Sequence, residues 1–227
     1  MPLLDQPLGH LARNIPGATG IFHEYQLDFC CGGQHSLRDA AQAKGIDAAP
    51  IAARLQALQA EATPDGAVDW SAVSPSMLID HILERFHERF HERHREQLPE
   101  LIRLARRVEH VHGDRPECPV GLSELLEAMW QELESHMQKE EQILFPMLAR
   151  GHGLRAGGPI AVMRMEHDQH GEALQRLMTL TNDITPPRAA CTTWRALYLG
   201  LSVFREDLME HIHLENNILF EGAVAAD

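Results

Sequence analysis

Residues 136–145 read HMQKEEQILF, and residues 211–220 read HIHLENNILF. Both stretches fit the pattern H-x-x-x-E-x-x-I-L-F. A second pair matches in the same order, because residues 91–98 read HERHREQL and residues 167–174 read HDQHGEAL. The copies lie 75 and 76 residues apart. Two motifs that recur in order at nearly one offset indicate a duplicated helical hairpin.

Apolar residues recur with a helical period over long stretches around these motifs. The pattern predicts helices over residues 76–110, with a kink at Pro99, and over 122–148, 159–182 and 192–220. No stretch shows convincing alternation of period two, so no strand is expected. We therefore predict an all-α chain whose larger part is an antiparallel four-helix bundle.

Several short helices are expected before the bundle, within residues 7–61. The turn Cys30-Cys31-Gly32-Gly33 interrupts them, and Ser36 is placed to cap the helix that follows. Residues 62–66 read ATPDG, a change of composition that marks a linker. The expected organisation is a small helical N-terminal domain at residues 1–62, a linker at 63–75 and the bundle at 76–227.

The composition narrows the class of protein. The chain of 227 residues has 20 Lys and Arg against 33 Asp and Glu, a net charge of −13. Nucleic acids and anionic membranes both require a basic face, so neither is an expected partner. No stretch reaches the roughly 20 apolar residues of a membrane span. Four cysteines are too few for a disulfide scaffold in a chain of this length, and a cytoplasmic location is expected.

The positions of the 15 histidines are more informative than their number. In the second long helix, His136 and Glu140 fill a gap in the apolar stripe. In the fourth, His211 and Glu215 fill the corresponding gap. A buried carboxylate without a partner costs several kcal/mol, so these inward polar groups predict a metal site. The stripe of the second helix consists of Leu122, Leu126, Met129, Leu133, Ile143, Leu144 and Met147.

The first and third helices supply further histidines to the same level of the bundle. Residues at i and i+4 share one helical face, so each His–Glu pair can reach one site. Two bridging glutamates with two histidines for each metal would give a dinuclear centre, and this donor set suits iron, manganese or zinc. The repeat alone leaves open whether His91 or His94, and whether His167 or His170, is the ligand.

The bundle resembles the hemerythrin-like HHE cation-binding domains. Together with DFCCGG at residues 28–33, the chain is similar to the repair-of-iron-centres family of di-iron proteins, of the YtfE, ScdA and NorA type. The similarity also covers residues 94–101, 139–146, 166–168 and 214–217. It implies two non-haem iron ions with an oxo bridge and carboxylate bridges. Carried over by position, the metal ligands are His91, His136, Glu140, His167, His211 and Glu215.

The resemblance also implies a function. The chain is expected to repair iron–sulfur clusters damaged by nitrosative or oxidative stress, by donating iron to the damaged proteins. The alternative is a protein that binds or reduces nitric oxide at the di-iron centre. Whether the chain is a turnover enzyme, and whether it forms a homodimer, is left open.

Four residues near the expected ligands have supporting roles in this interpretation. His94 and His170 are expected to donate hydrogen bonds around the centre or to lie in the bundle core. Glu132 and Glu166 lie close to ligands in the sequence and could line a path for iron or protons.

The cysteines carry a separate expectation. Cys30 and Cys31 are adjacent, so they are not expected to ligate one ion together, and a disulfide between them would be strained. The family resemblance implies a redox-active or nitric-oxide-reactive thiol here, or a docking site for an iron–sulfur partner. Cys118 and Cys191 have no partner motif and are expected to be inert.

Overall fold

The computed structural model describes residues 2–61, 70, 72–84 and 89–225, and within these ranges the side chains of residues 61, 89–96, 154, 224 and 225 are not described. The described chain is helical, as predicted, with one isolated β-bridge between Pro7 and Ser36 and no strand. It divides into two compact units, Met1–Leu78 with Met209–Asp227, and Ile79–Leu208.

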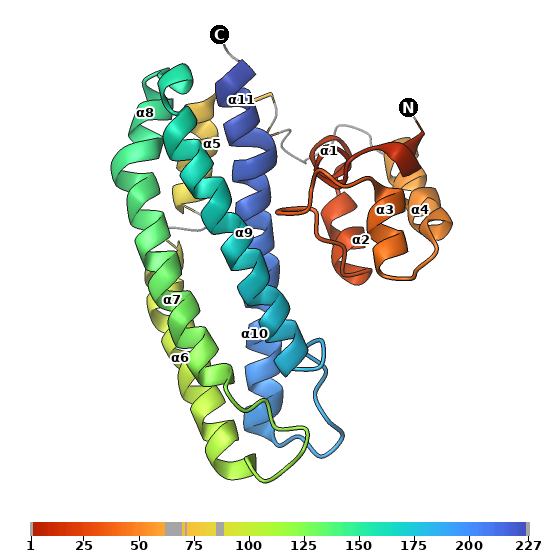
Figure 1. The fold of residues 1–227 in the computed structure, drawn as a ribbon, viewed down its shortest axis with the longest axis vertical. Coiled ribbons are helices and arrows are strands. Elements are labelled where there is room, and N and C mark those ends of the chain that lie inside the picture. The colour runs from red at the N-terminus through yellow and green to blue at the C-terminus, as the bar shows by residue number, and fades with distance from the viewer. Residues whose placement is uncertain (1, 62–69, 71, 85–88, 226–227) are drawn as a thin grey trace. The chain divides into compact units, whose positions relative to one another are not determined.

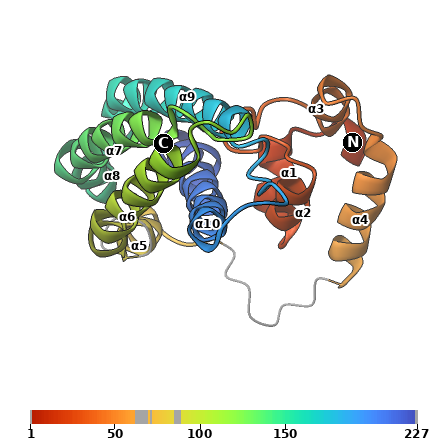
Figure 2. The ribbon, with the colours of Figure 1, turned by 90° about the horizontal axis from the view of Figure 1, so that it is seen from below.

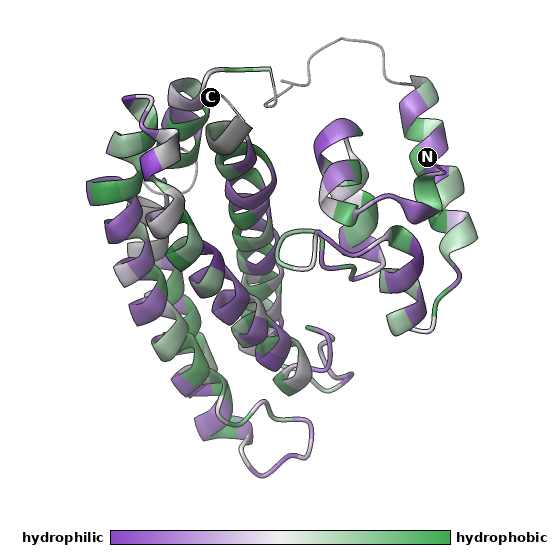
Figure 3. Cartoon of the chain, turned by 45° about the horizontal axis from the view of Figure 1, so that its top comes forward, coloured by the Kyte–Doolittle hydropathy of each residue, from purple (hydrophilic) through white to green (hydrophobic). Residues whose placement is uncertain are grey.

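The larger unit contains the long helices of the bundle. Here α6 (Arg89–His112), α7 (Leu122–Lys139), α9 (Gly157–Leu180) and the first part of α10 (Thr192–Leu214) run side by side (Figures 1 and 2). Apolar and polar residues alternate along each helix, as expected of helices with one buried face (Figure 3). The predicted four-helix bundle is therefore confirmed. The first predicted helix is seen as α5 (Pro75–Ile82) and α6, with residues 85–88 outside the described chain.

Side chains at the helix ends and crossings fix the bundle. The Glu109 carboxylate accepts hydrogen bonds from the backbone N–H and the hydroxyl of Ser123, at 3.0 and 2.6 Å. An anionic group at this position stabilises the N-terminus of α7 and ties it to α6. Gly200 lets α10 approach α6 closely, because a Cβ at this position would lie 2.6 Å from a methyl of Leu101.

A π-helical turn interrupts the helix in each copy of the repeat. Helix α7 continues into η3 (Glu140–Leu144) and α8 (Phe145–Ala149), and α10 continues into η5 (Glu215–Leu219) and α11 (Phe220–Ala225). Both π turns begin at the glutamate of the motif. The wider turn shifts the side chains that follow, and Ile143, which the helical stripe placed in the core, is 52% exposed. That expectation was wrong.

The smaller unit combines four short helices with the C-terminal segment. Its helices are α1 (Leu8–Asn14), α2 (Ala18–Glu24), α3 (Leu37–Ala43) and α4 (Ala48–Glu61), after a 3-10 turn, η1 (Leu3–Asp5). Ser36 caps α3 as predicted, by accepting a hydrogen bond from the backbone N–H of Asp39. The largest fully buried side chains of the smaller unit include Phe22, Phe29 and Phe220.

The Asn217 side chain joins the C-terminal segment to the N-terminal helices of this unit. Its amide donates hydrogen bonds to the carbonyl of Phe29, at 3.1 Å, and to Nδ1 of His213, at 2.9 Å. Its oxygen lies so close to Gly9 and Gly33 that a Cβ would be 2.4 and 3.1 Å from it. Glycine is therefore required at both positions for the close approach.

No helix within the described residues has the length and apolar character needed to cross a membrane.

Candidate metal centre

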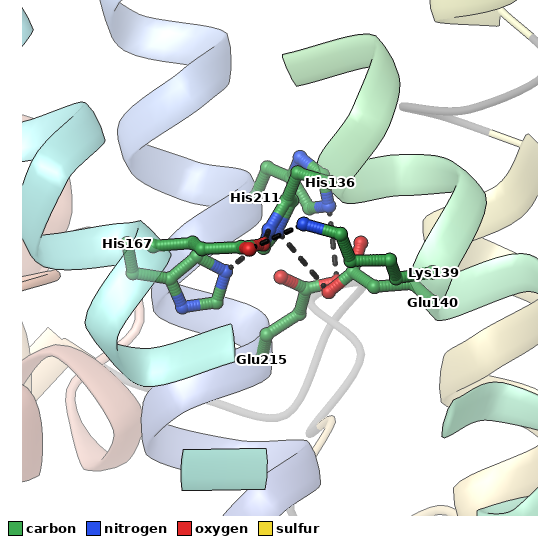
Figure 4. A network of polar contacts seen from close by, with 7 residues as sticks. His136, Lys139, Glu140, His167, His211 and Glu215 are labelled. Carbon is green, nitrogen blue, oxygen red and sulfur yellow. Dashed lines mark hydrogen bonds and ion pairs between the residues drawn. The ribbon is translucent and has the colours of Figure 1, made fainter. Parts of the chain in front are cut away.

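Helices α7 and α9 bring two histidines of the predicted site together. His136 Nε2 and His167 Nε2 lie 3.0 Å apart, and His136 Nε2 lies 3.3 Å from a carboxylate oxygen of Glu140 (Figure 4). Glu140 opens the π turn η3, one helical turn after His136. The three side chains are exposed by 2% or less. They therefore present two imidazole nitrogens and a carboxylate in the buried interior.

The second copy of the repeat has the same local arrangement. His211 Nε2 lies 3.0 Å from a carboxylate oxygen of Glu215, and both side chains are buried. The potential ligand atoms of His136, Glu140, His167 and Glu215 all lie within 4.8 Å of one another. His211 is not in this group of four but is hydrogen-bonded to one of its members.

The remaining predicted histidines have different outcomes. His170, the alternative to His167, is buried and packs edge-on against the His136 ring with the centroids 5.0 Å apart, outside the group of four. The backbone of His91 and His94 lies in α6, but their side chains are not described. The role of His91 as a ligand, and of His94 as its neighbour, thus stays a prediction.

Glu166 connects the site to the surface of the bundle. Its carboxylate accepts a hydrogen bond from His136 Nδ1, at 2.8 Å, and forms an ion pair with Lys139. Desolvation alone would raise the pKa of Glu166, but the hydrogen bonds from Lys139 and His136 outweigh it and lower the pKa below its usual value. An ionised Glu166 keeps the proton of a neutral His136 on Nδ1. The lone pair on Nε2 is then directed toward the other potential ligands, as at protein metal sites.

Glu132 and Glu166, which we expected to line a path, both border the same cavity. Glu132 and Glu166 line a cavity of about 230 Å³ together with Lys139 and His170. Glu132 is exposed and Glu166 is 14% exposed at its side chain, so the carboxylates lead from solvent toward His136. The sequence did not indicate Lys139, which follows His136 by three residues on the same helical face.

The cysteine turn lies in the smaller unit. Cys30 and Cys31 are both thiols, with their Sγ atoms 3.7 Å apart, and Asp28 Oδ1 accepts hydrogen bonds from both backbone N–H groups. Asn216 holds the turn by donating to the Cys30 carbonyl at 3.3 Å. The hydrogen bond to Cys31, and then burial, raise the pKa of Cys30 well above its usual value. Such a thiol is a poor nucleophile when no cation is present.

The two other cysteines are not equivalent. Cys118 is buried, and desolvation raises its pKa. The thiol of Cys191 instead lies 3.3 Å from Nε2 of His112, whose ring stacks on Trp194. Cys191 therefore has a hydrogen-bonding partner, which the sequence motifs did not reveal because the two residues are far apart in the chain.

Comparison with known proteins identifies the type of site. Residues 77–223 match the hemerythrin HHE cation-binding domain, and residues 4–59 match a domain of unknown function. An iron-sulfur cluster repair protein YtfE from Dickeya chrysanthemi is 52% identical over 98% of both chains. The chain belongs to the YtfE family.

Other relatives extend over the whole YtfE-family chain as well. A probable iron-sulfur cluster repair protein from Haemophilus influenzae is 52% identical over 97% of both chains. A YtfE protein from Yersinia pseudotuberculosis is 51% identical over the full length of both. The family resemblance seen in the sequence, from the cysteine turn to the bundle, is confirmed.

The donor set of this YtfE-family chain fits a metal. Imidazole nitrogens and carboxylate oxygens suit iron, and none of the four side chains in the cluster is a thiol. Two buried carboxylates in one cluster also need positive charge nearby, since isolated buried anions are costly. The cation-binding domain and the cluster together make this a metal-binding protein.

Proposed function

We propose that this chain repairs damaged iron–sulfur clusters by donating iron from a di-iron centre in its bundle. The observation that carries the proposal is the similarity, over at least 97% of the chain, to relatives named iron-sulfur cluster repair proteins. The similarity includes both the cysteine turn and the bundle. Partners of this activity are proteins whose iron–sulfur clusters have lost iron.

The proposed ligands are the four histidines His91, His136, His167 and His211 with the bridging carboxylates of Glu140 and Glu215. The five whose side chains are described are exposed by 2% or less. Neutral imidazoles add no charge, so the two carboxylates supply the negative charge that the protein would contribute to the two ions.

Residues around the ligands support loading and release in this proposal. The ionised Glu166, held by Lys139, keeps the His136 ring in one orientation. Each carboxylate lies 3.0–3.3 Å from the histidine one turn before it, so His–Glu pairs can partner one another when the cargo leaves. The hollow lined by Glu132 and Glu166 offers acidic oxygens along a route for the cation.

An iron-transfer assay tests this proposal. Protein loaded with isotopically labelled iron is mixed with an iron–sulfur hydratase, an enzyme that is inactive because its cluster has lost one exchangeable iron. We expect hydratase activity to return while labelled iron appears in the hydratase and an equal amount leaves the donor. Glu215→Ala should hold less iron and restore less activity. Glu124→Ala, at an exposed position near the start of α7, is the matched control and should behave as wild type.

The outcomes separate the proposal from its alternative. Recovery of the hydratase without labelled iron in it would contradict iron donation. Rapid conversion of nitric oxide to nitrous oxide, without loss of iron, would favour the nitric oxide alternative. Binding of nitric oxide, a homodimer and a cytoplasmic location stay predictions. Sedimentation of the loaded protein would determine its oligomeric state.

A further inference from the structure

The turn after α2 gathers three potential ligands that the bundle site does not use. One ligand atom from each of Asp28, Cys30 and Cys31 lies within 4.8 Å of the others. Adjacent side chains in an extended chain point in opposite directions, which is the basis for expecting the two thiols not to share an ion. Here the Asp28 carboxylate accepts hydrogen bonds from the N–H groups of both cysteines and bends the backbone, so that the thiols lie on one side. Adjacency in the sequence therefore does not prevent the two thiols from sharing an ion.

The spacing of the ligand atoms matches a tetrahedral ion. Two thiolates at about 2.3 Å from a shared metal lie roughly 3.8 Å apart. The observed distance between the Sγ atoms of Cys30 and Cys31 is 3.7 Å. A carboxylate oxygen at about 2.0 Å from the same ion would lie roughly 3.5 Å from each sulfur. Oδ1 of Asp28 lies 3.3 Å from Sγ of Cys30.

The turn is both anchored and accessible. Cys30 is buried, and its carbonyl accepts a hydrogen bond from Asn216, which fixes the backbone of the turn. Cys31 is half-buried and Asp28 is exposed, so an ion can enter from one side. Three ligands leave the fourth tetrahedral position open, as in zinc sites that exchange their fourth ligand.

We propose that Asp28, Cys30 and Cys31 form a second metal site, which takes a single thiophilic divalent cation of the zinc, cobalt and ferrous class. Binding exchanges two thiol protons, which go to solvent, for the cation, and no electron is transferred. Thiolate ligands select softer ions than the imidazoles and carboxylates of the bundle. A role of this site in transient binding of the donated iron would rest on the proposed function, but the binding of a cation to the site does not.

Cobalt is the probe for this site because a thiolate bound to Co²⁺ gives a charge-transfer band in the near ultraviolet. Full-length protein, already loaded with iron, is titrated with Co²⁺ without oxygen. We expect the band to saturate at one cobalt for each chain and to be lost in Cys30→Ser and in Cys31→Ser. Asp28→Asn should weaken cobalt binding at least about ten-fold, the loss typical for removing even an outer partner of a metal site.

Matched variants decide between this site and other thiols. The double variant Cys118→Ser/Cys191→Ser removes the cysteines of the larger unit and should keep the band unchanged. Far-ultraviolet circular dichroism and bundle iron content show whether each serine variant is folded. Absence of the band in wild type, its persistence in folded Cys30→Ser or its loss in the double variant would overturn the proposal. Because the readout is cobalt bound to thiolate, its failure is distinct from a failure of cluster repair.

Discussion

The contact between Asn217 and Gly9 can be tested by a double-mutant cycle, and the distances predict the sign of the coupling energy between the two residues. A Cβ at position 9 would lie 2.4 Å from the Asn217 oxygen and 2.8 Å from its Cγ. In Gly9→Ala the carboxamide must move, which costs about 1–3 kcal/mol as overpacking. The movement also weakens the hydrogen bond to the Phe29 carbonyl, by about 1 kcal/mol. Alanine is about 1 kcal/mol more favourable than glycine within a helix such as α1. We therefore expect Gly9→Ala to lower the free energy of unfolding by about 1–3 kcal/mol in total.

The second arm of the cycle removes the obstacle. Asn217→Ala alone loses two hydrogen bonds and should cost about 1–2 kcal/mol. In the double variant the new methyl group at position 9 no longer collides with a carboxamide, while its gain in helix propensity remains. We therefore expect the double variant to be no less stable than Asn217→Ala. The coupling between the two sites should be about 2–4 kcal/mol in favour of the pair.

Urea unfolding of iron-free protein, followed by circular dichroism, measures these differences. A chemical readout reports on the cysteine turn, which Asn217 holds through the Phe29 carbonyl. In Gly9→Ala we expect faster alkylation of Cys31, and in the double variant a rate close to that of Asn217→Ala. Additive losses in the double variant would refute the close packing of Asn217 on Gly9.

Three further predictions concern the larger unit and the C-terminal segment. Glu166→Ala removes the acceptor that orients His136, and iron affinity measured by chelator competition should fall about 10–100-fold; unchanged affinity would contradict the orienting role. Burial, followed by the charge of a nearby arginine, lowers the pKa of His213 to about 4, so the unfolded chain binds more protons between pH 6.5 and 4. The stability of iron-free protein should therefore decrease as the pH is lowered from 6.5 to 4, and His213 should account for about 3 kcal/mol of that decrease. His213→Gln should remove this contribution, and an unchanged dependence of stability on pH in that variant would contradict it. Iodoacetamide should modify the half-buried Cys191 faster than the buried Cys118, as mass spectrometry of peptides can measure, and equal rates would argue against this difference in exposure.

The sequence was sufficient to predict the bundle and the inward-facing His–Glu pairs because both depend on periodicity. Apolar residues at helical spacing place the helices, and the repeat places His136 with Glu140 and His211 with Glu215. The choice between His167 and His170 needed more, since both residues lie on the inward part of one helix. Here the structure puts His167 in the cluster of potential ligands and His170 beside it.

The features that the sequence did not predict depend on backbone geometry. The two thiols share one side because Asp28 binds both following N–H groups, and adjacency alone argued the opposite. Aspartate two residues before a cysteine pair is a recognisable signal for such a turn. The partnership of His112 with Cys191 spans 79 residues and becomes visible only in the folded chain.

The two π turns bear on how this fold arose and how it can be altered. A π turn is equivalent to a helix that has absorbed one additional residue without forming a loop. Both halves of the bundle carry it at the same glutamate, so a single insertion before the hairpin was duplicated explains both more simply than two separate events. Deleting one residue after Glu140 would restore an α-helix and leave the helix beyond it in nearly the same orientation, because the wide turn takes up the additional residue locally. The insertion therefore changes which residues follow the glutamate on each helical face, while the path of the helix stays nearly the same.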